Sequence, residues 1–339
     1  MIVSLTETAN ADSVKRELIT RGLWIEDVLR DSEGHVRHYS IAPCSTAVAL
    51  GEIATIEGVS GVSTPKTDHP LVDKQGPVVT IAGVTIGEGT PAWMCGPCSV
   101  ESEDQVKRAA DRLGSLGVPF LRGGAFKPRT SPYAFQGHGR VALQWMRKAA
   151  DAAGMRVVTE ALSEGDVGAV AEHADMVQVG SRNMHNYALL KAIGATKRPV
   201  LLKRGMAATV EEWLLAGEYL LASGSSAVVF CERGIRSFDD VTRNLLDLGA
   251  VALLAHVYRA PVIVDPSHGT GRRDLLLPMG RAAIAAGASG LMIETHDAPG
   301  DAKSDGPQAV PLDQIGALLR GFGGSMTRSD PARNEGGSR

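Results

Sequence analysis

The stretch PAWMCGPCSVESEDQVKRAADRLGSLGVPFLRGG, residues 91–124, decides the fold of most of the chain. Residues 92–95 and 119–121 are short apolar runs, and a helical pattern at 102–116 separates them. Apolar runs without alternation are typical of strands that helices cover on both faces of a parallel sheet. The stretch therefore predicts a strand–helix–strand unit with two parallel strands.

The same rhythm continues towards the C-terminus. The runs that we interpret as strands are 92–95, 119–121, 156–159, 176–179, 200–202, 227–231, 262–264 and 290–293. Helical patterns separate them, among others at 102–116, 141–153, 210–223 and 274–286. Eight such units in about 230 residues predict an α/β fold of the (β/α)8 TIM-barrel type. The alternative is a doubly wound open sheet.

The first 63 residues predict a separate small domain. Strands are expected at 2–5, 23–29, 36–42 and 59–63, with helices at 11–21 and 45–54. Gly22 is a suitable residue after the first helix, and Ser45 is the expected N-cap of the second. The order β-α-β-β-α-β is that of a ferredoxin-like α+β domain.

The remaining segments connect or extend these two domains. Residues 64–76 are polar, contain two prolines and predict a linker. Residues 78–89 alternate in polarity and predict a hairpin that turns at Ala82 and Gly83. We place the catalytic barrel at 77–322 and expect residues 323–339, a polar and glycine-rich tail, to be disordered.

The composition excludes several classes of protein. The 339 residues carry 35 Lys and Arg against 38 Asp and Glu, with a net charge of −3, so no nucleic-acid partner is expected. No apolar run is long enough to predict a transmembrane helix, and the N-terminus does not resemble a signal peptide. The four cysteines are few and scattered. We therefore expect a cytoplasmic protein whose thiols have individual roles, without a membrane partner.

Polar side chains follow every predicted barrel strand. They are Cys98, Arg122, Lys127, Glu160, Arg182, Lys203, Glu232, Arg233, Asp265, His268 and Glu294. In a barrel all of them converge on the C-terminal face, where barrel enzymes have their active sites. Arg129 also belongs to this cationic set, and so many cations at one mouth repel one another unless anions lie between them. Arginine binds phosphate and carboxylate through two parallel hydrogen bonds, which predicts a ligand with several negative charges.

A possible metal site lies on the same face. Cys98, His268, Glu294 and Asp305 offer a thiolate, an imidazole and two carboxylates. This mixed set suits Mn, Fe, Co or Zn better than Ca or Mg. The pair Cys95 and Cys98 also has the spacing of a redox motif, although no thioredoxin-like unit surrounds it.

Several segments together resemble one enzyme family. They are GPCSVES (96–102), LRGGAFKPRTSPYAFQG (121–137), VVTEAL (157–162), QVGSRNM (178–184), PVLLKRG (199–205), CERGIRSF (231–238), DPSHGTGRRDL (265–275), IETH (293–296) and SDGPQ (304–308). In this order they resemble the 3-deoxy-D-arabino-heptulosonate 7-phosphate (DAHP) synthases of the shikimate pathway. The resemblance is strongest to the type I subgroup with an N-terminal ferredoxin-like domain.

The resemblance implies a function for each matching residue. It implies a divalent metal bound by Cys98, His268, Glu294 and Asp305. It implies phosphoenolpyruvate bound by Arg122, Lys127, Glu160, Arg182, Lys203 and Arg233. Arg129, Thr130 and Ser131 match the positions that hold the phosphate of erythrose 4-phosphate. The residues expected to take part in catalysis are Lys127, Glu160, His268 and Cys98.

The resemblance leaves other properties open. A related synthase could use another aldose phosphate, or an amino analogue in secondary metabolism. A non-catalytic sensor that kept the barrel is the alternative outside the enzymes. The N-terminal domain implies feedback inhibition by an aromatic amino acid, with a stabilising or oligomerising appendage as the alternative. The family implies a homodimer or a homotetramer.

Overall fold

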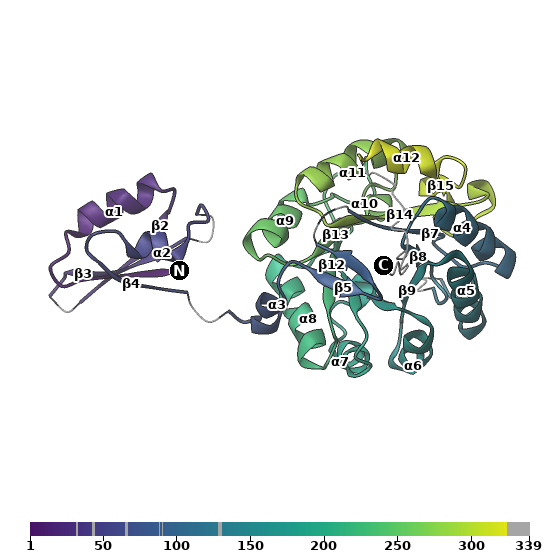
Figure 1. Ribbon diagram of the computed structural model, residues 1–339, viewed down its shortest axis with the longest axis horizontal. Coiled ribbons are helices and arrows are strands. Elements are labelled where there is room, and N and C mark those ends of the chain that lie inside the picture. The colour runs from purple at the N-terminus through teal and green to yellow at the C-terminus, as the bar shows by residue number, and fades with distance from the viewer. Residues whose placement is uncertain are drawn as a thin grey trace, which may run out of the picture. The chain divides into compact units, whose positions relative to one another are not determined.

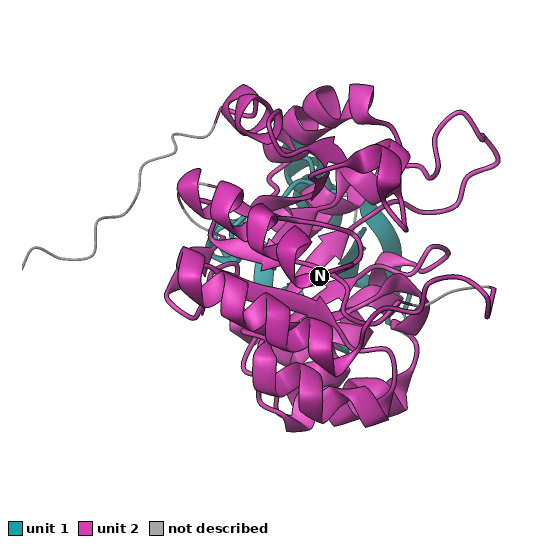
Figure 2. Ribbon diagram, turned by 90° about the vertical axis from the view of Figure 1, so that its right-hand side faces the viewer, with its two compact units in different colours: residues 1–68 teal, residues 69–339 magenta. Residues whose placement is uncertain are grey.

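The computed structural model describes residues 1–31, 33–42, 45–64, 67–87, 89, 91–127 and 131–323. The chain divides into two compact units, Met1–Asp68 and His69–Arg339, which Figure 2 distinguishes by colour. The predicted tail lies almost entirely outside the described residues. Within the described part of the chain, no helix combines the length and the apolar character needed to cross a membrane.

The first unit is a four-stranded antiparallel sheet with two helices. The sheet order is β2-β3-β1-β4. The elements are β1 (Ile2–Leu5), α1 (Ala11–Thr20), β2 (Ile25–Arg30), β3 (Val36–Ile41), α2 (Leu50–Ala54) and β4 (Val59–Ser63). Val3, Leu18, Tyr39 and Ile53 are almost fully buried between the sheet and the helices. The element order and the small antiparallel sheet confirm the ferredoxin-like prediction.

Helix α2 differs from its predicted extent. It begins at Leu50, with Ala49 as N-cap, and not after Ser45. The Ser45 hydroxyl accepts a hydrogen bond of 2.8 Å from the Trp24 backbone N–H. Because this oxygen is already engaged across the unit, it is not available to cap a helix.

The second unit is a closed barrel of eight parallel strands. They are β7 (Ala92–Gly96), β8 (Phe120–Arg122), β9 (Arg156–Glu160), β10 (Met176–Val179), β11 (Val200–Lys203), β12 (Val228–Glu232), β13 (Val262–Val264) and β14 (Gly290–His296). Each strand pairs with its neighbour in the chain, and β13 also pairs with β14. β7 pairs with β14, so the sheet closes and the open-sheet alternative is wrong. A two-residue strand, β15 (Val310–Pro311), pairs in parallel with the last residues of β14.

Helices surround the barrel, as Figure 1 shows in a view along its axis. They are α4 (Glu103–Ser115), α5 (Arg140–Ala153), α6 (Glu164–His173), α7 (Tyr187–Ala195), α8 (Val210–Ala222), α9 (Leu248–Ala252), α10 (Pro266–Thr270), α11 (Leu276–Ala285) and α12 (Ile315–Gly321). Their ends follow local chemistry. For example, Thr209 and Glu212 form a reciprocal capping box at the start of α8.

A hairpin packs against the interior of the barrel at one end. β5 (Val79–Ile81) and β6 (Val84–Ile86) pair through the predicted turn, in which Ala82 and Gly83 have positive φ angles of 46° and 85°. This combination is that of a type I′ turn. Val79, Ile81 and Ile86 join the apolar cluster that fills the barrel interior. Because Arg156, at the start of β9, donates a hydrogen bond of 2.8 Å to the Ala82 carbonyl, the hairpin lies at the N-terminal ends of the strands. The opposite, C-terminal end is left for a site.

The segment predicted as a linker contains a helix. α3 (Pro70–Gln75) buries Val72 in the core of the second unit. The Glu218 carboxylate accepts hydrogen bonds from the Leu71 and Val72 N–H groups at 2.9 Å and 3.0 Å. Leu71 and Val72 are the two large apolar residues in segment 64–76, so the segment is mostly polar and its composition indicated a linker.

Candidate active site

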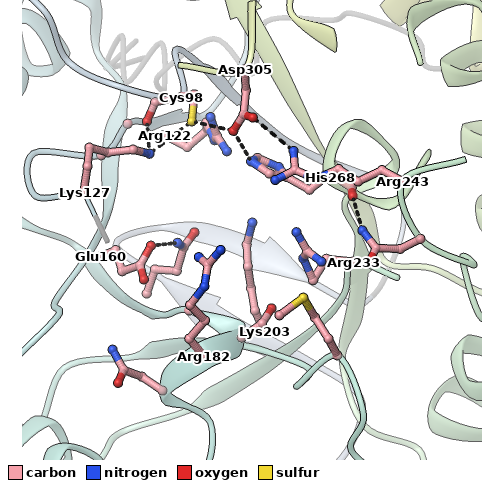
Figure 3. A pocket seen from close by; sticks show the side chains of 18 of the residues that line it. Cys98, Arg122, Lys127, Glu160, Arg182, Lys203, Arg233, Arg243, His268 and Asp305 are labelled. Atoms are coloured by element: carbon pink, nitrogen blue, oxygen red, sulfur yellow. Dashed lines mark hydrogen bonds and ion pairs between the residues drawn. The ribbon is translucent and has the colours of Figure 1, made fainter. Parts of the chain in front are cut away.

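One pocket occupies the C-terminal end of the barrel. Its volume is about 480 Å³, and Figure 3 shows the side chains that line it. Nine predicted site residues line it, namely Cys98, Arg122, Lys127, Glu160, Arg182, Lys203, Arg233, His268 and Asp305. The structure therefore brings together residues that are up to about two hundred positions apart in the chain, as expected for barrel loops.

Four side chains in this region place atoms that could bind a metal ion close to one another. One ligand atom from each of Cys98, His268, Glu294 and Asp305 lies within 4.8 Å of the other three. His268 Nε2 is 3.4 Å from Glu294 Oε2 and 3.6 Å from Asp305 Oδ2. The Cys98 thiol is 3.2 Å from Asp305 Oδ2. Asp305 has a φ of 51°, a left-handed conformation that is uncommon for a non-glycine residue and concentrates at functional sites.

A buried carboxylate orients His268. Asp265 Oδ1 accepts the His268 backbone N–H at 3.0 Å, and Asp265 Oδ2 lies 2.8 Å from His268 Nδ1. This leaves Nε2 directed at the other three ligand atoms, the arrangement in which metal-binding histidines are commonly held. Burial lowers the pKa of His268, but Asp265 and Asp305 outweigh burial and raise that pKa to about 9.

Lys127 connects the cationic side chains to the metal-ligand group. Its ammonium donates a hydrogen bond of 2.8 Å to the Cys98 carbonyl and lies 3.0 Å from the Cys98 sulfur. Burial and Glu294 raise the pKa of the Cys98 thiol, whereas Lys127 and His268 lower it. The lowering effects are larger, so this pKa falls below its ordinary value. A thiol with a lowered pKa forms the thiolate that binds metals.

Three cations are buried at the mouth. Arg122, Lys203 and Arg233 are each less than a tenth exposed. Lys203 is paired with Asp265 at 2.6 Å. Arg122 Nη1 and Arg233 Nη1 are buried without a hydrogen-bond partner among the described residues. Buried guanidinium donors without partners are costly, so their presence in a pocket indicates an anionic ligand.

Glu160 and Arg182 both line the pocket and come from neighbouring elements, β9 and the turn after β10 (Figure 3). Glu160 Oε2 accepts a hydrogen bond of 2.9 Å from the Gln178 amide. Arg182 is exposed in a 3₁₀ turn, Ser181–Asn183. Its exposure distinguishes it from the three buried cations.

The residues predicted to bind the aldose phosphate are only partly described. Arg129 and Thr130 lie outside the described residues. Ser131 is exposed, and its hydroxyl accepts a hydrogen bond of 3.3 Å from the Tyr133 N–H. Ser131 is not among the described residues that line the pocket.

Several residues that line the pocket were not predicted from the sequence. Gln178, Arg236, Arg243 and Asn244 line the pocket, and Gln308 contacts Glu294 from behind it. Gln178 lies within a predicted strand, where its polarity among apolar residues was the available signal. Arg243, Asn244 and Gln308 lie well beyond strand ends, so the rule that located the first set could not find them. Arg236 follows β12 as closely as Lys127 follows β8 and was within reach of that rule.

The Cys95 and Cys98 thiols face different surroundings. Both are free, and Cys95 is fully buried in the core between the strands and helices. Burial raises the pKa of the Cys95 thiol to about 12. Cys98 instead lines the pocket.

The fold and the site together define a (β/α)8-barrel enzyme with a group of candidate metal ligands and a cationic mouth. Residues 67–322 match the DAHP synthetase I family, and the chain belongs to that family.

Similar proteins agree with this assignment. The chain is 49% identical over 243 residues to the phospho-2-dehydro-3-deoxyheptonate aldolase of Thermotoga maritima, covering 72% of each chain. The crystal structure of the DAHP synthase of that organism superposes with a TM-score of 0.73 at 39% identity, covering 94% of this chain and 95% of the other. A 2-dehydro-3-deoxyphosphooctonate aldolase of Acidithiobacillus ferrooxidans is 34% identical, covering 67% of this chain and 86% of its own.

Proposed function

We propose that the chain condenses phosphoenolpyruvate with D-erythrose 4-phosphate and water to give DAHP and phosphate, the first step of the shikimate pathway and of aromatic amino acid biosynthesis. The observation that carries this proposal is the direct contact between the cationic side chains of the pocket and the metal-ligand group. Lys127 joins the cationic mouth to the metal-ligand group within 3.0 Å of Cys98. Both groups of residues therefore line one pocket, in which the two substrates would meet.

Phosphoenolpyruvate fits the buried cations. Its phosphate and carboxylate carry several negative charges, and Arg122, Arg233 and Lys203 supply a matching set of donors. The Nη1 atoms of Arg122 and Arg233, which have no hydrogen-bond partner among the described residues, would then donate to the ligand. Arg182, which is exposed, completes the phosphate site.

The four ligand residues fit a divalent cation. Glu294 Oε1 is buried without a hydrogen-bond partner in the described structure, which a cation would satisfy. The thiolate, imidazole and carboxylates form the mixed donor set that Mn, Fe, Co and Zn accept. A bound cation supplies Lewis-acid polarisation of a carbonyl oxygen. Which of these metals is used stays a prediction, while metal dependence is general in the family.

The side chains of the pocket position the reaction. The methylene carbon of phosphoenolpyruvate forms a bond to the aldehyde carbon of erythrose 4-phosphate. Water then adds to the phosphoenolpyruvate carbon that carries the phosphate. The bond from that carbon to the phosphate oxygen breaks last and releases phosphate. Lys127 is placed to donate a proton to the alkoxide that forms from the aldehyde oxygen. Glu160, held by Gln178, is placed to orient the water. Arg182, Lys203 and Arg233 hold the departing phosphate through preorganised charge.

The identity of the aldose is tested by comparing acceptors. We expect phosphate release from phosphoenolpyruvate with erythrose 4-phosphate to have a far higher kcat/KM than with arabinose 5-phosphate. A preference for the five-carbon sugar would overturn the proposed substrate while retaining the reaction class. The aromatic amino acid effector, the dimeric or tetrameric state and the cytoplasmic location stay predictions.

A further inference from the structure

The loop between β12 and α9 folds back over the metal-ligand group. Its two sides pair through reciprocal backbone hydrogen bonds of 2.9 Å between Ile235 and Leu245. This pairing brings Arg243 and Asn244 next to the segments that carry His268 and Asp305. Neither residue belongs to the predicted ligand or substrate set.

The Arg243 side chain contacts one carboxylate of the metal-ligand group. Its Nη1 donates to Asp305 Oδ1 at 3.0 Å. The other oxygen, Oδ2, faces the Cys98 thiol and His268 Nε2. Arg243 therefore occupies the outer oxygen and leaves the inner one for a cation. The guanidinium is planar and always charged, so it fixes the carboxylate's rotation as well as its position.

The same guanidinium orients a second carboxylate through an amide. Arg243 Nη1 also donates to Gln308 Oε1 at 3.0 Å, and Gln308 Nε2 donates to Glu294 Oε2 at 2.9 Å. A guanidinium has no acceptor, so only the oxygen of the Gln308 amide can face it. This determines that the amide N–H points at Glu294. Gln308 is only 3% exposed, so water cannot easily replace these contacts.

The backbone of the loop holds the third ligand. The Arg243 and Asn244 N–H groups each donate at 2.9 Å, to the carbonyls of Thr270 and Gly269. The Asn244 side chain donates to the His268 carbonyl at 3.0 Å. The fit is close, because a Cβ on Gly271 (φ +69°) would lie 2.8 Å from Arg243 Cβ. Only glycine tolerates both that conformation and that approach.

We propose that Arg243, acting with Gln308 and Asn244, is a positioning residue that preorganises three of the four metal-ligand side chains. The proposal rests on the proposed metal site and adds residues that do not themselves bind the cation. Outer residues that orient metal ligands typically change metal affinity by about 10–100-fold when they are lost. The loop thereby couples the mouth of the pocket to the affinity for the metal.

The test measures metal binding by the full-length, metal-free protein. Mn²⁺ is titrated and the free ion is followed by electron paramagnetic resonance, and the absorption spectrum of the Co²⁺ form reports ligand geometry. We expect Arg243→Met to raise the Kd for Mn²⁺ by about 10–100-fold and to change the Co²⁺ spectrum. Arg243→Lys, which keeps a charged donor, should recover part of the loss. Gln308→Met should act in the same direction, and the double variant should lose less than the sum because both residues act through one chain of hydrogen bonds.

The matched control is Arg272→Met. Arg272 lies in the same part of the chain, is exposed and pairs with Asp274 at 2.8 Å, without a contact to any ligand residue. It should keep the wild-type Kd and spectrum. Wild-type Kd and spectrum in both Arg243→Met and Gln308→Met, or an equal loss in Arg272→Met, would overturn the proposal. If Arg243→Met does not fold by circular dichroism, Gln308→Met alone decides. Failure of the unaltered protein to bind Mn²⁺ or Co²⁺ would instead contradict the metal site itself.

Discussion

The Lys127 ammonium lies 3.0 Å from the Cys98 sulfur and donates a hydrogen bond of 2.8 Å to the Cys98 carbonyl. Lys127 follows β8 and Cys98 follows β7, two neighbouring strands of the barrel. The Lys127 side chain therefore both lines the pocket and contacts a residue of the metal-ligand group. This position makes Lys127 the first residue to test.

Lys127→Ala should lower kcat by about 10²–10⁴-fold, the usual contribution of a positioned proton donor. Lys127 is partly exposed, so the thermal unfolding midpoint should change little. The measurement is steady-state kinetics together with a melting curve. A variant with unchanged kcat would exclude the proton-donor role.

Arg233→Met should weaken phosphoenolpyruvate binding without loss of stability. Arg233 Nη1 is buried and without a partner in the described structure, so its removal leaves no other charge unpaired. We expect a loss of about 2 kcal/mol or more in binding, roughly thirtyfold in Kd. The unfolding midpoint should be equal or higher. Calorimetric titration measures the Kd for phosphoenolpyruvate, and a melting curve measures the unfolding midpoint. A marked drop in stability would contradict this interpretation.

Lys203→Met should reduce both binding and stability. Lys203 is 2.6 Å from the fully buried Asp265, so the substitution removes one of the two cationic partners of this carboxylate and leaves only His268. Breaking a buried ion pair completely costs about 3–5 kcal/mol, and the loss of one of two partners should cost less than that but still lower stability. Chemical denaturation of the two methionine variants side by side measures the difference. Equal stabilities would show that the Lys203–Asp265 pair is not the structural contact that we describe.

The three described thiols should differ in reactivity. The pKa of Cys98 is lowered, whereas burial raises the pKa of Cys95 and of Cys231 to about 12. A lower pKa means more thiolate at a given pH, so iodoacetamide at about pH 8 should modify Cys98 first. The reaction should slow as the pH falls through the lowered pKa of Cys98. Peptide mapping by mass spectrometry, in a Cys44→Ser background, identifies the modified thiol; faster labelling of Cys95 would contradict the assignment.

Removal of residues 1–68 should leave an active barrel. Removal of residues 1–76 should destabilise it, because Gln75 forms hydrogen bonds with both the N–H and the carbonyl of Val228. Leaving a buried backbone group unpaired costs about 1–3 kcal/mol. Melting curves of the two truncated chains test this difference. Inhibition by tyrosine and phenylalanine, compared between the full chain and residues 69–339, then separates a regulatory first unit from a stabilising one.

The barrel could be predicted because each strand is a short apolar run and each loop starts with a polar residue. Residues 176–179 and 262–264 were predicted with the bounds that the structure has. The metal-ligand group was predicted from residue types in loops and at strand ends together with the resemblance to the enzyme family, and the structure places its four members together.

The remaining features depend on contacts that local patterns do not contain. Ser45 was expected to cap a helix, but its hydroxyl accepts from Trp24, 21 residues away. Helix α3 depends on Glu218, which is 147 residues from Leu71. Arg243 acts through Gln308, and nothing in the spacing of these two residues indicates that they are neighbours in space.

The most direct test of the central claim is phosphoenolpyruvate consumption with erythrose 4-phosphate and Mn²⁺, with and without a chelator. The account predicts consumption with stoichiometric release of phosphate, loss of activity on chelation and recovery when Mn²⁺ is restored. No consumption by protein with verified bound metal would contradict the assignment of these substrates, and consumption that the chelator does not affect would contradict the role of the metal.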